Sequence, residues 1–335
     1  MERSVPLQTM PPLVPRMLIR AGGLAGLDQT AVAGIPGLSL SGHDGIRLPT
    51  SSTVRVWEEW SSPIREWGGG AQVLRAWRLG AFGVWDYLFV AAETLAHAFE
   101  AGGRHAAAIS DPGDGLEPVW GEDGLTVGYR SVSAEHPEFP LIAEFALALL
   151  VAEASAGAGR RVVPLRVCLP SSTPRRHGHL VEAFGTPDID FRAELPSITF
   201  STADVSRRLP RADPVLAAIL SEYANAQVAA SRPMMCWLDR LRAEVDAAFA
   251  EGGPDLARTA HRLGMSPRTL QRRLKGESTS WRDLVEQRRH QRAELLLRQR
   301  SLTMESIAAR VGYTDARTLR RALHRWYGRG VVPKP

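Results

Sequence analysis

The chain of 335 residues is longer than one ordinary hydrophobic core, so we expect at least two domains. Its formal net charge of +5 is unevenly divided, because residues 255–335 carry 19 Lys and Arg against 7 Asp and Glu, whereas residues 1–254 carry 22 basic and 29 acidic residues. A basic segment on an acidic body indicates that only the C-terminal part contacts a polyanion.

Several classes of protein are disfavoured by what the sequence lacks. Cys168 and Cys236 are too few for a disulfide framework, and no Cys and His spacing is typical of a zinc site. No uninterrupted run of about 18 apolar residues is present, and prolines interrupt the N-terminal segment, so we expect neither a membrane span nor a signal peptide. No nucleophile elbow, P-loop or dinucleotide fingerprint is present either. We therefore expect a cytoplasmic protein that is not an enzyme and needs no metal and no cofactor.

The first 230 residues mix helical and extended patterns. Apolar residues at helical spacing predict a helix at 13–27, and Ser51-Ser52-Thr53 can cap a helix that carries Trp57 and Trp60. Further along, periodicity and turn residues predict an extended segment at 79–85, helices at 91–101, 139–156, 179–184 and 214–230, and strands at 106–110, 125–132, 162–169, 189–191 and 198–200. This order predicts an α+β domain over residues 1–230, with the nearly all-apolar helix 139–156 at its centre.

Residues 231–253 are expected to form a linker. Trp237, Leu238, Leu241 and Val245 share one face of a helix there, and Gly252-Gly253-Pro254 separates it from the following domain.

The third segment, residues 254–335, is predicted to be all-helical and to contain two tandem helix-turn-helix units. In the first unit, Gly264 follows a short apolar helix face and can take the left-handed conformation that a sharp turn requires. Ser266 then caps a second helix that has Pro267 at its first position. The second unit repeats this arrangement, with Gly312 at the turn and Thr314-Asp315 at the start of the next helix.

A long helix at 281–297 joins the two units. Its length is about 25 Å. Such a spacer can place two reading helices in successive major grooves on one side of DNA, roughly 34 Å apart.

At this point two stretches resemble the AraC/XylS family of transcription regulators: LGMSPRTLQRRLKGESTSWRDLVEQRRHQRAELLL and SIAARVGYTDARTLRRALHRWYG. Earlier stretches resemble the arabinose-binding-type N-terminal domain of one branch of that family: AWRLGAFGVWDYLFVAAETLAHAF, VEAFGTPDIDF and RADPVLAAILSEYA. The resemblance implies a regulator that binds double-stranded DNA and contacts RNA polymerase. It also implies a small-molecule effector and a possible homodimer. We expect no membrane partner. The sign of regulation stays open.

The same resemblance assigns outward-facing residues of the two reading helices to DNA. Arg can bond bidentately to guanine and Gln to adenine, and the family's base-reading positions match Arg268, Gln271 and Arg272 in the first unit. In the second unit they match Arg317, Thr318 and Arg321, with Arg320 expected on the phosphate backbone. The predicted DNA-binding set is Arg268, Thr269, Gln271, Arg272, Arg317, Thr318, Arg320 and Arg321.

For the N-terminal domain, aromatic residues in mixed surroundings are the candidates for lining an effector pocket, namely Trp77, Trp85, Tyr87, Trp120 and Tyr129. Aromatic residues of this kind are more often part of the core than of a pocket. The leading alternative is therefore an N-terminal domain that binds no ligand and only oligomerises or contacts polymerase. An enzyme carrying a DNA-binding module ranks third.

Overall fold

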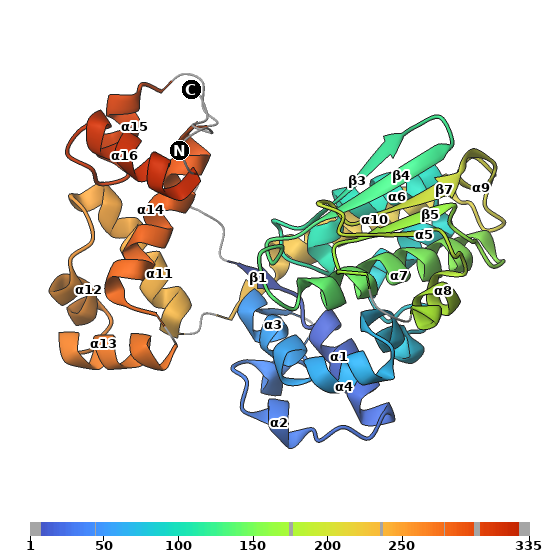
Figure 1. The fold of residues 1–335 in the computed structure, drawn as a ribbon, viewed down its shortest axis with the longest axis horizontal. Helices are drawn as coiled ribbons and strands as arrows, with labels where there is room; N and C mark the ends of the chain where they lie inside the picture. Colours follow the sequence, from blue (N-terminus) through green and yellow to red (C-terminus); the bar gives the residue numbers. More distant parts are fainter. Residues whose placement is uncertain are drawn as a thin grey trace. The chain divides into compact units, whose positions relative to one another are not determined.

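A computed structural model describes residues 8–43, 45–173, 177–234, 237–277, 279–297 and 302–327. The chain divides into two compact units (Figure 1). The N-terminal unit is Gln8–Met234, and the C-terminal unit contains the described residues 237–327. Cys236 lies outside the described residues, and Cys168 is a half-buried free thiol in the N-terminal unit.

The N-terminal unit is an α+β domain, which confirms the predicted fold class. Its main sheet contains β3 (Gly115–Trp120), β4 (Gly124–Arg130), β7 (Ser197–Ser201), β5 (Arg166–Leu169) and β6 (Ile189–Phe191), in that spatial order. Neighbouring strands are antiparallel except β5 and β6, which are parallel. A smaller sheet contains β1 (Thr9–Met10), β2 (Ile46–Pro49) and β8 (Arg232–Pro233).

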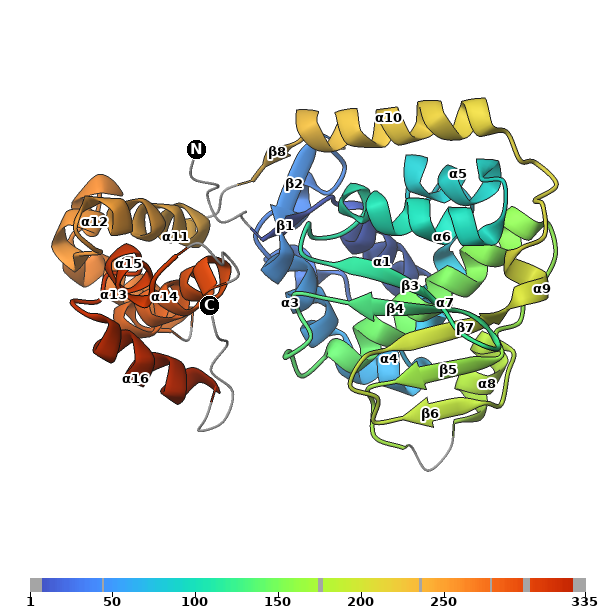
Figure 2. The same cartoon turned by 90° about the horizontal axis from the view of Figure 1, so that it is seen from above.

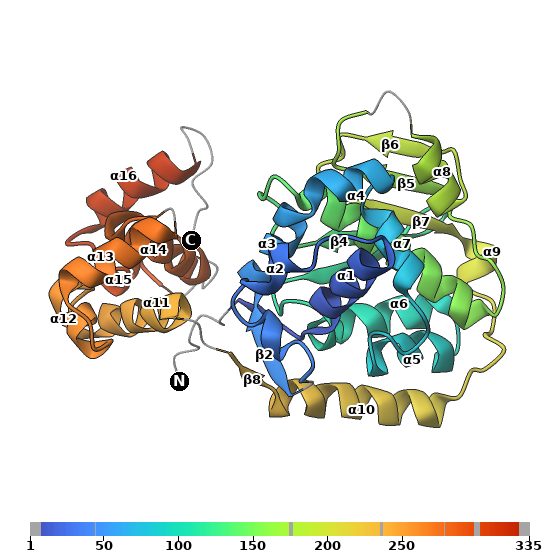
Figure 3. The ribbon, with the colours of Figure 1, turned by 90° about the horizontal axis from the view of Figure 1, so that it is seen from below.

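Helices cover one face of the main sheet (Figures 2 and 3). Side chains alternate accordingly along β4 and β7: Val127 and Ile198 are buried, whereas Thr126 and Thr199 lie on the other face with their hydroxyl oxygens 2.9 Å apart. The α-helices of the N-terminal unit are α1 (Leu13–Leu24), α2 (Thr30–Ala33), α3 (Thr50–Glu59), α4 (Ser61–Trp67), α5 (Val84–Ala91), α6 (Leu95–Arg104), α7 (Phe139–Ala158), α8 (Gly178–Phe184), α9 (Thr202–Val205) and α10 (Pro214–Ala230).

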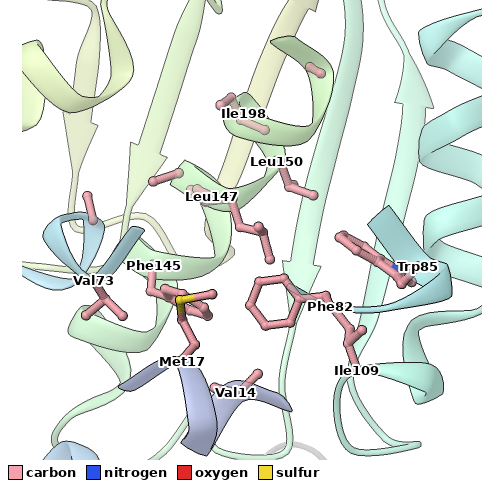
Figure 4. Packing of buried hydrophobic residues seen from close by; sticks show 14 of the residues in the cluster. Val14, Met17, Val73, Phe82, Trp85, Ile109, Phe145, Leu147, Leu150 and Ile198 are labelled. Atoms are coloured by element: carbon pink, nitrogen blue, oxygen red, sulfur yellow. The ribbon is translucent and has the colours of Figure 1, made fainter. Parts of the chain in front are cut away.

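Helix α7 is the centre of this core, as the sequence predicts. Phe145 of α7 packs against Trp57 of α3 and against Phe82, with ring centroids 5.7 and 6.3 Å apart. Figure 4 shows Phe145, Leu147 and Leu150 pointing toward the side chains that α1 and Phe82 contribute. By length and composition α7 could cross a membrane, with a mean hydropathy of 1.7. However, 61% of that apolar window is buried inside the domain, as expected for a core helix.

Some predicted elements differ from the observed ones. Residues 79–83 form turns before α5, and the predicted strand at 106–110 is a short 3₁₀ turn at Ala106–Ala108. Helix α6 continues through Gly102 and Gly103, where the sequence predicts its end. Close packing explains why glycine stands at both positions inside the helix, because a Cβ at Gly102 would lie 2.8 Å from the Phe89 ring and one at Gly103 would lie 2.9 Å from the Leu116 carbonyl oxygen.

The C-terminal unit is all-helical, which confirms the second half of the predicted fold class. It has two hydrophobic cores, and one helix, α14, contributes to both (Figure 1). Leu284 and Val285 of α14 pack in the first core, and Ala293 and Leu297 pack in the second. The helices are α11 (Trp237–Ala248), α12 (Leu256–Arg262), α13 (Pro267–Gly276), α14 (Trp281–Leu297), α15 (Met304–Arg310) and α16 (Ala316–Tyr327).

Helix α11 lies within the stretch expected to be a linker, yet it packs inside the C-terminal unit. Its Leu241 and Val245 are fully buried in the first core. Asp246 of α11 forms an ion pair with Arg288 of α14, whose Nε donates to an Asp246 oxygen at 2.9 Å. This helix therefore belongs to the first helix-turn-helix unit in the folded protein.

Both helix-turn-helix corners have the geometry that their glycines predict. Gly264 has φ +67° and Gly312 has φ +78°, both in the left-handed region. In each corner the amide after the glycine donates at 2.9 Å to the carbonyl five residues earlier, from Met265 to Ala260 and from Tyr313 to Ala308. These bonds satisfy the last carbonyls of α12 and α15.

Replacing Gly264 by Val is expected to destabilise the C-terminal unit by ~1–3 kcal/mol, because a β-branched residue is strained at positive φ. No heavy atom of the described residues lies within 4 Å of a Cβ built at Gly264, so the cost would come from the backbone rather than from a clash. Thermal melting of a fragment of residues 235–335 followed by circular dichroism measures it. Gly276→Val is the matched control, since Gly276 also has open space but no positive φ. Equal melting midpoints for the two variants would contradict this account of the corner.

Candidate nucleic-acid interface and effector cavity

Helix α13 is positioned by its cap and by two buried leucines. The Ser266 hydroxyl accepts a hydrogen bond from the Thr269 amide at 3.2 Å, and Pro267 occupies the first helical position. Leu270 and Leu274 are fully buried in the first core. The opposite face of the helix is therefore left to solvent.

That exposed face carries the residues predicted to read DNA. Arg268, Thr269, Gln271, Arg272 and Lys275 together line one shallow surface groove. Neither Arg268 nor Arg272 forms an ion pair with any residue that the structure describes, so both guanidinium groups are available to a ligand. Lys275 is not among the residues predicted to bind DNA, although it follows Arg272 by three positions and so lies on the same helix face.

Helix α16 repeats this arrangement. The Asp315 carboxylate accepts the Thr318 amide at 2.7 Å, which caps the helix, and Leu319 and Leu323 are fully buried in the second core. This backbone hydrogen bond holds the pKa of Asp315 below its usual value. Arg317, Arg320 and Arg321 are exposed, and none of them pairs with an acid in the described part of the chain.

The two helices match residue by residue when they are counted from their caps. Arg268 and Arg317 are both second after the cap, Thr269 and Thr318 third, Gln271 and Arg320 fifth, and Arg272 and Arg321 sixth. The eight residues predicted from the sequence therefore form two equivalent sets of four. Both threonines are half-buried beside their caps, whereas the other six side chains are exposed.

The remaining arginines in this unit are largely committed to internal contacts. Besides the Arg288–Asp246 pair, the Arg289 guanidinium lies 5.0 Å from the centroid of the Tyr313 ring, and Arg292 donates from Nε to the Arg310 carbonyl at 2.8 Å. In α16, Arg325 pairs with Glu286 of α14. Several arginines thus stabilise the fold, whereas Arg268, Arg272, Arg317, Arg320 and Arg321 face outward from α13 and α16.

The N-terminal unit contains a mostly apolar cavity that offers about 80 Å³ to the centre of a water-sized molecule. It lies between the sheet and α1, α3 and α7, and its lining residues are Met10, Val14, Thr50, Thr53, Val54, Trp57, Trp85, Ala106, Ile109, Ser110, Asp114, Gly115, Leu116, Tyr129, Ser131, Ser133, Ile142, Phe145, Ala146, Leu149 and Leu150.

Two of the five aromatic candidates from the sequence line this cavity. Trp85 is buried, with its indole nitrogen donating to the Gly102 carbonyl at 3.0 Å, and Tyr129 lies on the inward face of β4. Trp77 is half-buried near Glu153, and Tyr87 and Trp120 are 43% and 52% exposed. These three are not among the lining residues.

The polar groups of the cavity gather near the start of β3. Asp114 accepts the Val132 amide at 2.9 Å, and burial raises the pKa of its carboxyl to about 6. Burial and the nearby Asp114 also raise the pKa of the Tyr129 phenol. Sequence reasoning missed Asp114 because the preceding Asp111-Pro112-Gly113 indicated only a turn. Because the following strand, β3, was not predicted either, no pattern in the sequence marked Asp114.

Two family models match the chain. One, described as the arabinose-binding domain of AraC transcription regulators, N-terminal, matches residues 23–209, and one described as a helix-turn-helix domain matches residues 259–330. The first of these covers more than half of the chain.

Similar proteins include several transcription regulators. An uncharacterized HTH-type transcriptional regulator of Mycobacterium tuberculosis is 44% identical over 82 residues, which are 24% of either chain. The HTH-type transcriptional regulator VirS of the same species is 32% identical over 122 residues, 36% of this chain and 35% of VirS. The matched segments thus span about a third or less of these relatives. Among solved structures, the transcriptional regulator CdpR from Pseudomonas aeruginosa is similar over 98% of both chains, at 20% identity and a TM-score of 0.43.

The family predicted from the sequence is confirmed by the match over residues 23–209 together with the helix-turn-helix match at the C-terminal end. The chain belongs to the AraC family of transcription regulators.

Proposed function

We propose that the protein regulates transcription by inserting α13 and α16 into two successive major grooves of one DNA site, under the control of a small molecule bound in the N-terminal cavity. The observation that carries the DNA-binding part is the pair of equivalent arginine faces on α13 and α16, whose cations have no acidic partner among the described residues. Arginines arranged in this way can reach base edges and phosphates at once.

Helix α14 supports reading of two grooves rather than one. It is 17 residues long, or about 25 Å, and both hydrophobic cores are built on it. The two reading helices are therefore attached to one rigid element. In this proposal residues 254–335 bind DNA, residues 1–230 form the effector domain, and residues 231–253 connect them, with α11 moving with the DNA-binding domain.

The test is the salt dependence of DNA binding. A fragment of residues 235–335 should bind duplex DNA with an affinity that falls steeply as salt rises, because each neutralised phosphate contributes about −0.9 to the slope of log K against log salt. Six exposed basic side chains on the two helices have no partner among the described residues, namely Arg268, Arg272, Lys275, Arg317, Arg320 and Arg321. If about four to six of them neutralise phosphates, the slope is roughly −4 to −5. The acidic fragment 8–234 should show no such binding. Comparable DNA binding by both fragments would contradict the assignment of DNA binding to the C-terminal unit alone.

The cavity favours effector control over the alternative in which the N-terminal domain only oligomerises or contacts polymerase. A domain that serves only for packing has no need of a concave, largely apolar cavity with a few polar groups at one end, whereas small-molecule sites have that form. A cytoplasmic location and a contact with RNA polymerase remain part of the proposal through the family.

A homodimer is also part of the proposal, with a second copy of this chain packed against α10. Val215, Ile219 and Tyr223 lie on one side of α10 and are 71%, 57% and 59% exposed. Glu222 is the one charged residue of this 17-residue helix, so two copies could face each other with little repulsion between like charges.

A further inference from the structure

The cavity is acidic at its polar end, and the lining residues that the structure describes carry no positive charge to balance the acid. Asp114 is the one charged residue among its described lining residues. The nearby Arg47 is not a lining residue, and its guanidinium is held by backbone carbonyls of Thr9, Ala107 and Ser110 at 2.8 to 2.9 Å. Arg47 also interacts with the carboxylate of Asp111, and this nearer negative charge weakens the attraction between Arg47 and Asp114.

This charge pattern selects among classes of ligand. A carboxylate or phosphate would bring a second negative charge beside Asp114 with no cation to meet it, which is costly in a buried site. A sugar would leave most of its hydroxyl groups against the aliphatic and aromatic side chains that form most of the lining. The residues present therefore do not fit arabinose, despite the name of the matching domain family.

A cation, by contrast, has several favourable contacts available. Asp114 supplies a carboxylate, and Trp57, Trp85 and Tyr129 supply aromatic rings, which attract cations through their electron-rich faces. Thr53 supplies an additional polar group, because its side chain is 3% exposed, it lines the cavity, and its hydroxyl has no hydrogen-bond partner among the described residues. Such an unpartnered buried hydroxyl is what a bound ligand would satisfy.

We infer that the cavity binds a molecule with an apolar body and a protonated amine head, the amine beside Asp114 and the body between α1, α3 and α7. This inference rests on the proposed function of the cavity as the effector site. Apolar lining side chains, including Val14, Phe145 and Leu150, would contact the body of the ligand. The sole charged lining residue would then form an ion pair in the complex.

The experiment compares three probes that share one apolar chain and differ in the head group: octylamine, 1-octanol and octanoate. Each is titrated into the full-length protein at pH 7.5, with binding followed by tryptophan fluorescence, since Trp57 and Trp85 line the cavity. We expect octylamine to bind at least tenfold more tightly than 1-octanol, and octanoate to bind most weakly.

The variant that tests the assignment is Asp114→Asn, in which the side-chain oxygen that accepts the Val132 amide is kept and the charge is lost. It should reduce the preference for octylamine over 1-octanol to within about threefold while leaving 1-octanol binding nearly unchanged. Asp123→Asn removes an exposed acid outside the cavity and should keep the full preference. If Asp114→Asn does not fold, Asp114→Ser provides the same loss of charge.

The outcomes separate the ligand class from the function of the cavity. Binding of all three probes without preference for the amine, or tightest binding of octanoate, would overturn the amine assignment and leave the cavity as a ligand site. A preference that survives in Asp114→Asn would overturn it as well. Binding of none of the probes would overturn both the amine assignment and the effector role of the cavity.

Discussion

Replacing Arg272 by Ala is expected to weaken binding to the specific DNA site by about 1–3 kcal/mol, or roughly 5- to 150-fold, and to relax base preference in one half of the site. Arg321→Ala should have the same effect in the other half. The reason is geometric: the two residues hold the same position on α13 and α16, and each lies on the face opposite the buried leucines of its own core.

The two losses should add to within about 0.5 kcal/mol, because the side chains belong to separate cores and share no partner. The double variant would then lose about 2–6 kcal/mol of specific binding. Systematic base substitution across the site, repeated with each variant, measures the affinity and the position of the lost preference together.

Matched controls are available one position or one turn away. Arg273 follows Arg272 but lies over the Trp237 ring, 5.7 Å from its centroid, and Arg325 of α16 pairs with Glu286. Arg273→Ala and Arg325→Ala should leave base preference unchanged. If Arg272→Ala and Arg321→Ala lose discrimination at the same bases, or at none, reading of two grooves is wrong. If only Arg272→Ala has an effect on preference, the second unit holds the phosphate backbone and the first alone reads sequence.

The C-terminal unit was predictable because its signals are local. Ser266 and Asp315 accept amides three residues further on, and Gly264 and Gly312 adopt the left-handed conformation. Each of these features depends on residues within one turn of helix. For the same reason α14, bounded at residues 281 and 297, and α10, capped by Asp213, matched the predicted helices.

The N-terminal unit was less predictable because distant contacts decide its local structure. The apolar segment at 106–110 has the composition of a strand, yet Arg47, some 60 residues earlier, binds the carbonyls of Ala107 and Ser110. Strand β3 was not predicted at all, since it contains Pro118 and half of its residues are exposed; it is an edge strand, where proline is tolerated. The cavity was hard to predict for the same reason. Its polar residues Thr53 and Asp114 lie far apart in the sequence, and no periodic pattern links them.

A buried pair of carboxyl groups in the N-terminal core leads to the second prediction. Asp86 of α5 and Glu153 of α7 are both fully buried. Asp86 accepts the amides of Gly80 and Phe82 at 2.6 and 3.2 Å, whereas neither oxygen of Glu153 has a hydrogen-bond partner in good geometry among the described residues. Burial, together with the charge of Asp86, raises the pKa of Glu153 well above its usual value. Glu153 is therefore the member of the pair that keeps a proton in the folded protein.

The direction of the pH effect follows from this raised pKa. Between the ordinary pKa of 4.5 and the higher pKa in the folded state, the folded chain binds a proton at Glu153 that the unfolded chain has released. The free energy of unfolding must then fall as pH rises through this window. Burial raises the pKa of Glu144 to about 7, so Glu144 acts in the same direction. His105, whose pKa burial lowers, acts in the opposite direction at pH values below about 6.5.

We therefore expect Glu153→Gln to stabilise the N-terminal unit at pH 8 by ~2–4 kcal/mol and to change its stability by less than ~1 kcal/mol at pH 5. The Gln side chain has nearly the same size and shape as the protonated acid, but it never ionises. Urea unfolding of residues 8–234 at several pH values, with and without the substitution, gives the difference, in which the contributions of Glu144 and His105 cancel. Glu100→Gln, an exposed position on α6, should leave the pH profile unchanged. A difference between Glu153→Gln and wild type that stays constant from pH 5 to pH 8 would show that Glu153 is already ionised in the folded core.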